Sequence, residues 1–172
     1  MVYEPNSYDD TSTKRVVIVI PPGDNPELDM QYWSSQADKH GLLLVGVHDW
    51  TTDGIFELVG TIHTQEQADK LYLTGFSHGG YTSCSIGFEN QNKVSGIIPM
   101  GAWCSDFDLG TSVQTVPVLA VFGDKDYYAL DDAGNISDFF YTIDSELILV
   151  PGLNHSFPLS VMDQVGDWIM QH

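Results

Sequence analysis

The residues with the clearest chemical potential lie in the segment 70–87, KLYLTGFSHGGYTSCSIG. Residues 71–74 are a short apolar run that predicts a strand, and Ser77 follows within the pattern GFSHG at residues 75–79. A G-x-S-x-G pattern between a strand and a helix is typical of a sharp turn that presents a serine hydroxyl as a nucleophile. The two glycines suit that turn because its strained backbone leaves no space for larger side chains. Such a motif can also arise by chance, so the prediction depends on whether the chain supplies partners for Ser77.

The first partner is a base, because a serine hydroxyl is a poor nucleophile until its proton is removed. Apart from His78 within the motif, two histidines follow Ser77: His155 and the terminal His172. His155 lies in PGLNHSF, directly after the last predicted strand, whereas the final residue of a chain is expected to fray. His155 is therefore the predicted base, and the side chain of His78 is expected to be simply exposed on the turn.

The second partner is an acid that orients the base. Asp124 and Asp126 both come just after a predicted strand that ends at Gly123, and either could instead cap a turn. Asp126 is preferred because it completes a G-x-x-D arrangement at the end of that strand. Asp106 and Asp108, after the preceding strand, are weaker candidates.

Acyl transfer through Ser77 also needs two N–H donors for the oxyanion of a tetrahedral intermediate. The backbone amide of His78 is the predicted first donor, because it follows the nucleophile at the start of a helix. The second is expected from the loop after the first predicted strand, from Asp24 or alternatively from Gly23 or Asn25. The carboxylate of Asp24 would then have to point outward, since a negative side chain beside an oxyanion is unfavourable.

The elements around these residues predict an α/β fold. Six apolar runs predict strands, at residues 15–20, 42–47, 71–74, 94–100, 117–123 and 146–150. Besides the helix after the serine motif, helical patterns lie at residues 28–40, 54–67, 136–143 and 158–170. This alternation predicts a mostly parallel sheet with helices on both faces. Right-handed crossovers would bring the loops after all the strands, and with them the candidate residues, to one edge of the sheet.

Composition limits the classes of partner. The 172 residues, 42% of them hydrophobic, suit a single domain, residues 1–172, with a polar lead-in at residues 1–13. With 24 acidic residues against six Lys and Arg, the formal charge is −18, which disfavours nucleic acid and anionic lipid as partners. The charge serves solubility, and it also fits salt adaptation or attraction of cationic substrates. No apolar run is long enough for a membrane span.

Three further features complete the expectations. Aromatic residues at the predicted sheet edge are expected to line a substrate cleft in part, the rest being ordinary packing: Trp50, Trp103, Tyr127 and Phe157, with Phe107 and Tyr128 beside them. The two cysteines lack metal-ligand spacing and are too few for a disulfide framework, so Cys84 is expected as a buried free thiol. The polar lead-in leaves two localisations open, the cytoplasm or a secreted protein whose leader has been removed.

Several segments together resemble the serine esterases of the α/β-hydrolase superfamily: residues 16–23, GFSHGG, FGDKD and GLNHSF. Within that superfamily, YEPNSYDD, PPGDN and YWSSQADKHGLLLVGV are similar to the polyhydroxybutyrate depolymerase and feruloyl esterase branch, or to small carboxylesterases. The resemblance spans essentially the whole chain. It implies Ser77 as nucleophile, His155 as general base, Asp126 as orienting acid, an acyl-enzyme, and no metal or other cofactor.

The chain also departs from the pattern of that superfamily. It has Pro22-Gly23 where many relatives have His-Gly, and the first two strands of the full fold are expected to be missing, with residues 3–8 at most a remnant. No segment has room for a lid, so the expected form is a minimal lidless α/β-hydrolase with an open cleft for small-molecule or polymeric esters. An amidase or peptidase with the same three residues, and a non-catalytic binding protein on this fold, are the alternatives.

Overall fold

The computed structural model describes residues 1–8, 12–48, 52–65, 68–104, 115–132 and 144–172. Within this part of the chain one sheet has seven strands in the order β1-β3-β2-β4-β5-β6-β7. The strands are β1 (Val2–Tyr3), β2 (Arg15–Ile20), β3 (Leu42–Gly46), β4 (Lys70–Phe76), β5 (Gly96–Met100), β6 (Val118–Gly123) and β7 (Ser145–Val150). All pairs are parallel except β1 with β3.

All six predicted strands are confirmed, with ends within two residues of those expected. The central strand β2 shows why the pattern was clear: five of its six residues are buried. Val17 and Val19 pack on one face of the sheet, and Val16, Ile18 and Ile20 pack on the other. A strand covered on both sides needs an unbroken β-branched run rather than an alternating one.

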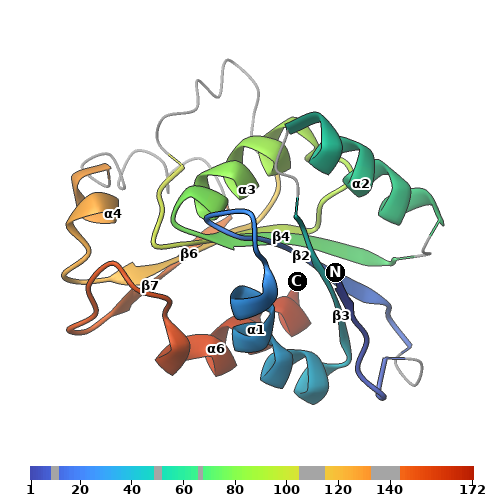
Figure 1. Ribbon diagram of the computed structural model, residues 1–172, viewed down its shortest axis with the longest axis horizontal. Helices are drawn as coiled ribbons and strands as arrows, with labels where there is room; N and C mark the ends of the chain where they lie inside the picture. Colours follow the sequence, from blue (N-terminus) through green and yellow to red (C-terminus); the bar gives the residue numbers. More distant parts are fainter. Residues whose placement is uncertain (9–11, 49–51, 66–67, 105–114, 133–143) are drawn as a thin grey trace.

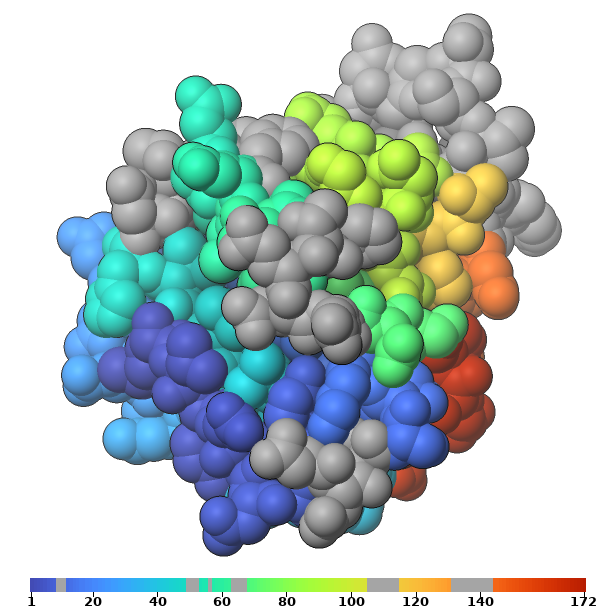
Figure 2. Space-filling model, turned by 90° about the vertical axis from the view of Figure 1, so that its right-hand side faces the viewer, coloured from blue at the N-terminus to red at the C-terminus, as the bar shows by residue number. Residues whose placement is uncertain are grey.

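The seventh strand, β1, comes from the polar lead-in. Val2 and Tyr3 pair antiparallel with Val45 and Leu44 of β3, and Val2 remains 63% exposed. Figure 2 shows these N-terminal residues, in dark blue, at the surface beside the cyan atoms that follow α1. Two residues at an exposed edge carry too little hydrophobic pattern to be recognised in the sequence.

Helices cover both faces of the sheet (Figure 1). Their bounds are α1 (Glu27–His40), α2 (Thr52–Gln65), α3 (His78–Glu89), α4 (Tyr127–Asp132), the 3₁₀ turn η2 (Leu159–Val161) and α6 (Met162–Gln171). Residues of α2, α3 and α4 join one core layer, and residues of α1 and α6 join the other. The expected helices at 28–40 and 54–67 correspond to α1 and α2, and the closing helix is η2 followed by α6. The helix expected at 136–143 lies outside the described residues.

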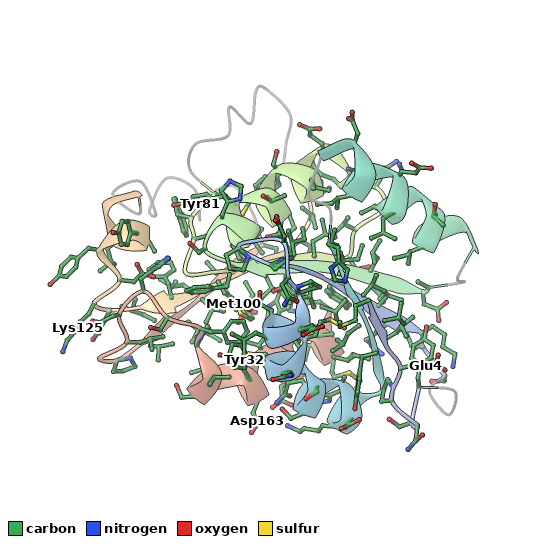
Figure 3. All side chains as sticks on the ribbon, viewed as in Figure 1. Glu4, Tyr32, Tyr81, Met100, Lys125 and Asp163 are labelled. Atoms are coloured by element: carbon green, nitrogen blue, oxygen red, sulfur yellow. A yellow bond between two sulfur atoms is a disulfide. The ribbon has the colours of Figure 1, made fainter. Side chains whose placement is uncertain are left out.

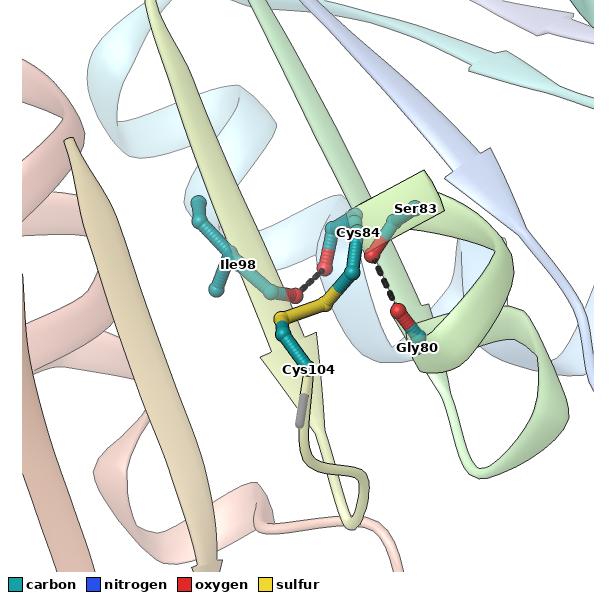
Figure 4. The surroundings of a disulfide bond; sticks show 6 residues. Gly80, Ser83, Cys84, Ile98 and Cys104 are labelled. Carbon is teal, nitrogen blue, oxygen red and sulfur yellow. Dashed lines mark hydrogen bonds between the residues drawn. A yellow bond between two sulfur atoms is a disulfide. The ribbon is translucent and has the colours of Figure 1, made fainter. Parts of the chain in front are cut away.

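The expectation that Cys84 is a free thiol is wrong. Cys84, in α3, is bonded to Cys104, four residues beyond β5, and both side chains are at most 1% exposed (Figure 4). The bond forms because the chain leaves β5 alongside α3: a Cβ placed on Gly80 would lie only 2.6 Å from the methyl group of Ala102. Two cysteines 20 residues apart give no sign of this pairing in the sequence.

Removing this disulfide is expected to destabilise the protein. For a loop closed over a separation of 20 residues, the chain-entropy relation gives a loss of about 3 kcal/mol in the free energy of unfolding when both cysteines become alanine. Urea unfolding of wild type and C84A/C104A, without reductant, measures the difference. Wild type unfolded with dithiothreitol is the control and should lose the same stability. A loss below about 1 kcal/mol would contradict a closed loop of this length.

Asp29 gives the stability of the protein a specific pH dependence. It lies in the first turn of α1 with 6% of its surface exposed, and burial raises the pKa of its carboxyl to about 6. Between about pH 4 and pH 6 the folded protein therefore holds a proton that the unfolded chain has released. The contribution of Asp29 to stability is complete below the unfolded pKa and is lost as the pH rises through about 6.

The variant Asp29→Asn is expected to gain stability over wild type as the pH rises. A pKa raised from 3.8 to about 6 corresponds to a gain of about 2 to 3 kcal/mol between pH 4 and pH 7.5. Urea titrations of both proteins at the two pH values measure it. Glu27→Gln, an exposed carboxylate in the same helical turn, is the matched control and should show no such change. A difference between Asp29→Asn and wild type that is the same at both pH values would contradict the raised pKa.

Candidate active site

Ser77 occupies a strained turn between β4 and α3. Its φ is 52° and its ψ is −119°, and no other described non-glycine residue has a positive φ. The turn is held by packing of backbone on backbone: a Cβ on Gly79 would overlap the carbonyl oxygen of Ile20, and a Cβ on Gly75 would overlap Gly79 itself. The Ser77 amide also donates a 2.8 Å hydrogen bond to the carbonyl of Met100. The predicted strand–turn–helix setting of the serine is therefore present.

An unbroken hydrogen-bond chain runs from Ser77 to a buried carboxylate. The Oγ of Ser77 lies 2.8 Å from Nε2 of His155. The Nδ1 of His155 lies 3.0 and 2.9 Å from the two carboxylate oxygens of Asp126. With Nδ1–H donating to Asp126, Nε2 is left to accept the Ser77 hydroxyl proton. The side chain of His155 is 28% exposed and that of Asp126 is 1% exposed, so solvent reaches the histidine but not the acid.

Three neighbouring regions at one edge of the sheet supply these side chains. Ser77 follows β4, Asp126 follows β6 and His155 follows β7. Parallel strands place the loops after their carboxyl ends at the same edge, which is why positions far apart in the sequence meet here. The sequence predicted this meeting from the alternation of strands and helices.

The two aspartates after β6 have different surroundings. Asp126 precedes α4, and its Oδ1 accepts a 3.3 Å hydrogen bond from the amide of Ala129, so it caps the helix as well as facing His155. Asp124 is exposed, and its Oδ1 accepts a 2.6 Å hydrogen bond from the amide of Gly152. Asp106 and Asp108 lie outside the described residues.

Aromatic rings surround His155. The ring centroids of Phe76 and Tyr128 lie 5.0 and 5.1 Å from that of the imidazole. Phe157 lies 6.0 Å from Phe76 and 4.5 Å from Tyr32, which extends from α1 (Figure 3). Phe76 and Tyr32 were not among the predicted cleft residues. Phe76 stands in the variable position of the serine motif, where any side chain is compatible with the pattern, and Tyr32 lies on a helix whose spacing suggested only packing.

The predicted cleft residues differ in their burial and in their neighbours. Phe157 is partly buried in the aromatic group around His155, and Tyr127 is 73% exposed on α4. Trp103 is 1% exposed and packs edge-on against Phe122, so it belongs to the core rather than to a cleft wall. The reason is the close path of the chain between β5 and the disulfide at Cys104. Trp50 and Phe107 lie outside the described residues.

The predicted oxyanion donors follow two adjacent strands. His78 begins α3 directly after Ser77, and Asp24 follows β2, which pairs with β4 in the register Ile20 to Gly75. The side chains of His78 and Asp24 are both exposed. Their backbone roles toward an oxyanion stay predictions.

Across the described ranges, no group of three or more His, Cys, Asp or Glu side chains is arranged to hold a metal ion. The helices in that same part of the chain include none that is long and apolar enough to cross a membrane.

Comparison with known proteins shows the fold. No family model and no curated protein sequence matches the chain. Among solved structures, Est1E from Butyrivibrio proteoclasticus superposes with a TM-score of 0.75 at 14% identity, covering 99% of this chain and 92% of that one. FphF, a fluorophosphonate-binding serine hydrolase of Staphylococcus aureus, gives 0.70 at 18% identity, covering 98% and 90%. XC6422 from Xanthomonas campestris, a serine hydrolase without a lid, gives 0.70 at 17% identity, covering 99% and 86%. The chain has the α/β-hydrolase fold, as predicted.

Proposed function

We propose that the protein is a serine hydrolase of carboxylic esters. Ser77 is the nucleophile, His155 the general base and Asp126 the acid that orients it. The observation that carries this proposal is the continuous hydrogen-bond chain from Ser77 Oγ through the imidazole to the buried Asp126 carboxylate. The likeness of the fold to proteins described as serine hydrolases agrees with this assignment.

The proposed reaction has two steps. As Ser77 Oγ attacks the ester carbonyl, His155 Nε2 takes the hydroxyl proton and then gives it to the departing alcohol. The acyl group stays on Ser77. A water molecule, deprotonated by the same nitrogen, attacks the acyl carbonyl, and Ser77 leaves with the proton returned by His155. Asp126 accepts a hydrogen bond from Nδ1–H throughout, which keeps the imidazole in the productive tautomer and stabilises its cationic form.

The developing oxyanion needs donors that are already in place. The backbone amide of His78, at the start of α3, is one proposed donor, and that of Asp24 is the other. An exposed side chain at Asp24 is compatible with this role, since its carboxylate need not approach the oxyanion. Phe157, in the aromatic group around His155, and Tyr127, exposed on α4, are the proposed substrate contacts.

An assay of the wild-type protein tests the proposal. Purified protein is incubated between pH 6 and pH 9 with p-nitrophenyl esters of acetate, butyrate and longer acids, and with the matching p-nitroanilides. We expect turnover of the esters and much slower turnover of the anilides, because an amine leaves less readily than an alcohol. Faster anilide cleavage would reassign the protein as an amidase. No turnover of any ester would leave a non-catalytic protein of this fold.

A further inference from the structure

The turn after β6 and the loop after β7 are joined along their length. β6 and β7 pair up to Gly123 and Val150. Beyond that point, the Asp124 amide donates a 3.0 Å hydrogen bond to the carbonyl of Val150, and the Lys125 amide donates one of 3.0 Å to the carbonyl of Leu153. The sheet pairing thus continues beyond the strands as loop-to-loop contact.

Two features make this contact unusually close. A Cβ on Gly123 would overlap the carbonyl of Leu153, so the backbones touch where the loops leave the sheet. Gly152 has a φ of 75°, a left-handed conformation that turns its amide toward Asp124. The Oδ1 of Asp124 accepts a hydrogen bond from that amide at 2.6 Å, so a side chain as well as the backbone joins the two loops.

The two joined loops carry the proposed acid and base. Asp124 lies two residues before Asp126, and Gly152 lies three residues before His155. Because these connections are short, the hydrogen bond between Asp124 and Gly152 restricts how far His155 can move relative to Asp126. The side chain of Lys125, between the two aspartates, extends outward from the molecule (Figure 3).

We propose that Asp124 is a positioning residue for catalysis, and that its carboxylate holds the loop carrying His155 against the turn carrying Asp126. This inference rests on the proposed function. Asp124 does not touch the reacting atoms. It acts through Gly152, because the hydrogen bond to that amide sets where the loop begins its path to His155. Loss of that acceptor should let the imidazole move away from Asp126 and Ser77, which slows the chemical step more than it weakens substrate binding.

Three variants test the proposal: Asp124→Ala, Asp124→Asn and Asp144→Ala. Asparagine keeps an oxygen that can accept the hydrogen bond from Gly152. Asp144 is an exposed carboxylate just before β7, at its opposite end, and serves as the matched control. Each protein is assayed with p-nitrophenyl acetate far below its melting temperature, and kcat is expressed per titrated active site. Loss of positioning should lower kcat of Asp124→Ala by about 10- to 100-fold with KM nearly unchanged. Asp124→Asn and Asp144→Ala should stay within about threefold of wild type.

Each outcome decides for or against the proposal. A merely structural role would lower the melting temperature of Asp124→Ala and leave kcat per active site unchanged, which would overturn it. An equal loss of kcat in Asp124→Asn would mean that the negative charge of Asp124 matters rather than its ability to accept the hydrogen bond. That result would also overturn the proposal. If the wild type hydrolyses no ester, the proposed function fails. Amide exchange of Gly152 then tests the contact itself: it should be at least about tenfold faster in Asp124→Ala than in Asp144→Ala, and equal rates would overturn the contact.

Discussion

Replacing Ser77 with alanine is expected to lower kcat for ester hydrolysis by about 10⁴- to 10⁶-fold, because no other group can form the acyl-enzyme. Initial rates with p-nitrophenyl acetate measure the loss. The fold should remain intact, since alanine keeps the Cβ of serine, adds no atom to the turn at a φ of 52° and leaves the glycine packing around it unchanged. A melting temperature close to that of wild type would establish this.

Ser85→Ala is the matched control for that variant. Ser85 lies on the same helix, α3, and is partly buried. It should keep activity within about twofold of wild type, as expected of a substitution away from the reacting groups. If Ser77→Ala retained more than about 1% of the wild-type kcat, Ser77 would not be the nucleophile.

The second large effect is expected for Asp126→Asn, with a fall in kcat of about 10⁴-fold. An asparagine can turn its NH₂ group toward Nδ1 of His155. The imidazole then adopts the tautomer with hydrogen on Nε2, and that nitrogen can no longer accept the Ser77 proton. The helix cap is preserved, because the asparagine oxygen can still accept the hydrogen bond from Ala129. The rate loss should therefore come without a comparable loss of stability.

Asp124→Asn separates the two aspartates. It should cost little, because its side-chain oxygen still accepts the hydrogen bond from Gly152. Rates for both variants across pH 6 to 9, with melting temperatures, make the comparison. A large loss in Asp124→Asn together with near-normal activity in Asp126→Asn would transfer the orienting role to Asp124.

The parts of the fold predicted from sequence are those whose pattern has one physical cause. Buried parallel strands such as β2 need unbroken apolar runs, and the serine turn needs Gly75 and Gly79 because backbone atoms occupy the space of their side chains. Because strands alternate with helices, a parallel sheet with right-handed crossovers was predicted, and the positions of the candidate acid and base at one sheet edge followed from it. Asp126 lies 49 residues after Ser77, and His155 lies 78 residues after it. The three could nevertheless be grouped from the sequence.

The parts that sequence could not predict depend on contacts between distant segments. The disulfide between Cys84 and Cys104 follows from the path of the chain beyond β5, and the same path buries Trp103. Tyr32 reaches Phe157 only because α1 packs near the loop after β7. The sequence favoured Asp126 over Asp124 without excluding either, because both are compatible with a turn; their different hydrogen bonds, to His155 and to Gly152, depend on distant loops.

Covalent labelling with a fluorophosphonate tests most directly whether Ser77 is an activated nucleophile. Wild type and Ser77→Ala are incubated with the probe at neutral pH, and the intact mass and the labelled peptide are determined. We expect one adduct per chain, on Ser77 in the peptide containing GFSHGG, and none on the alanine variant. An unlabelled wild-type protein, or an adduct on a different residue, would contradict it.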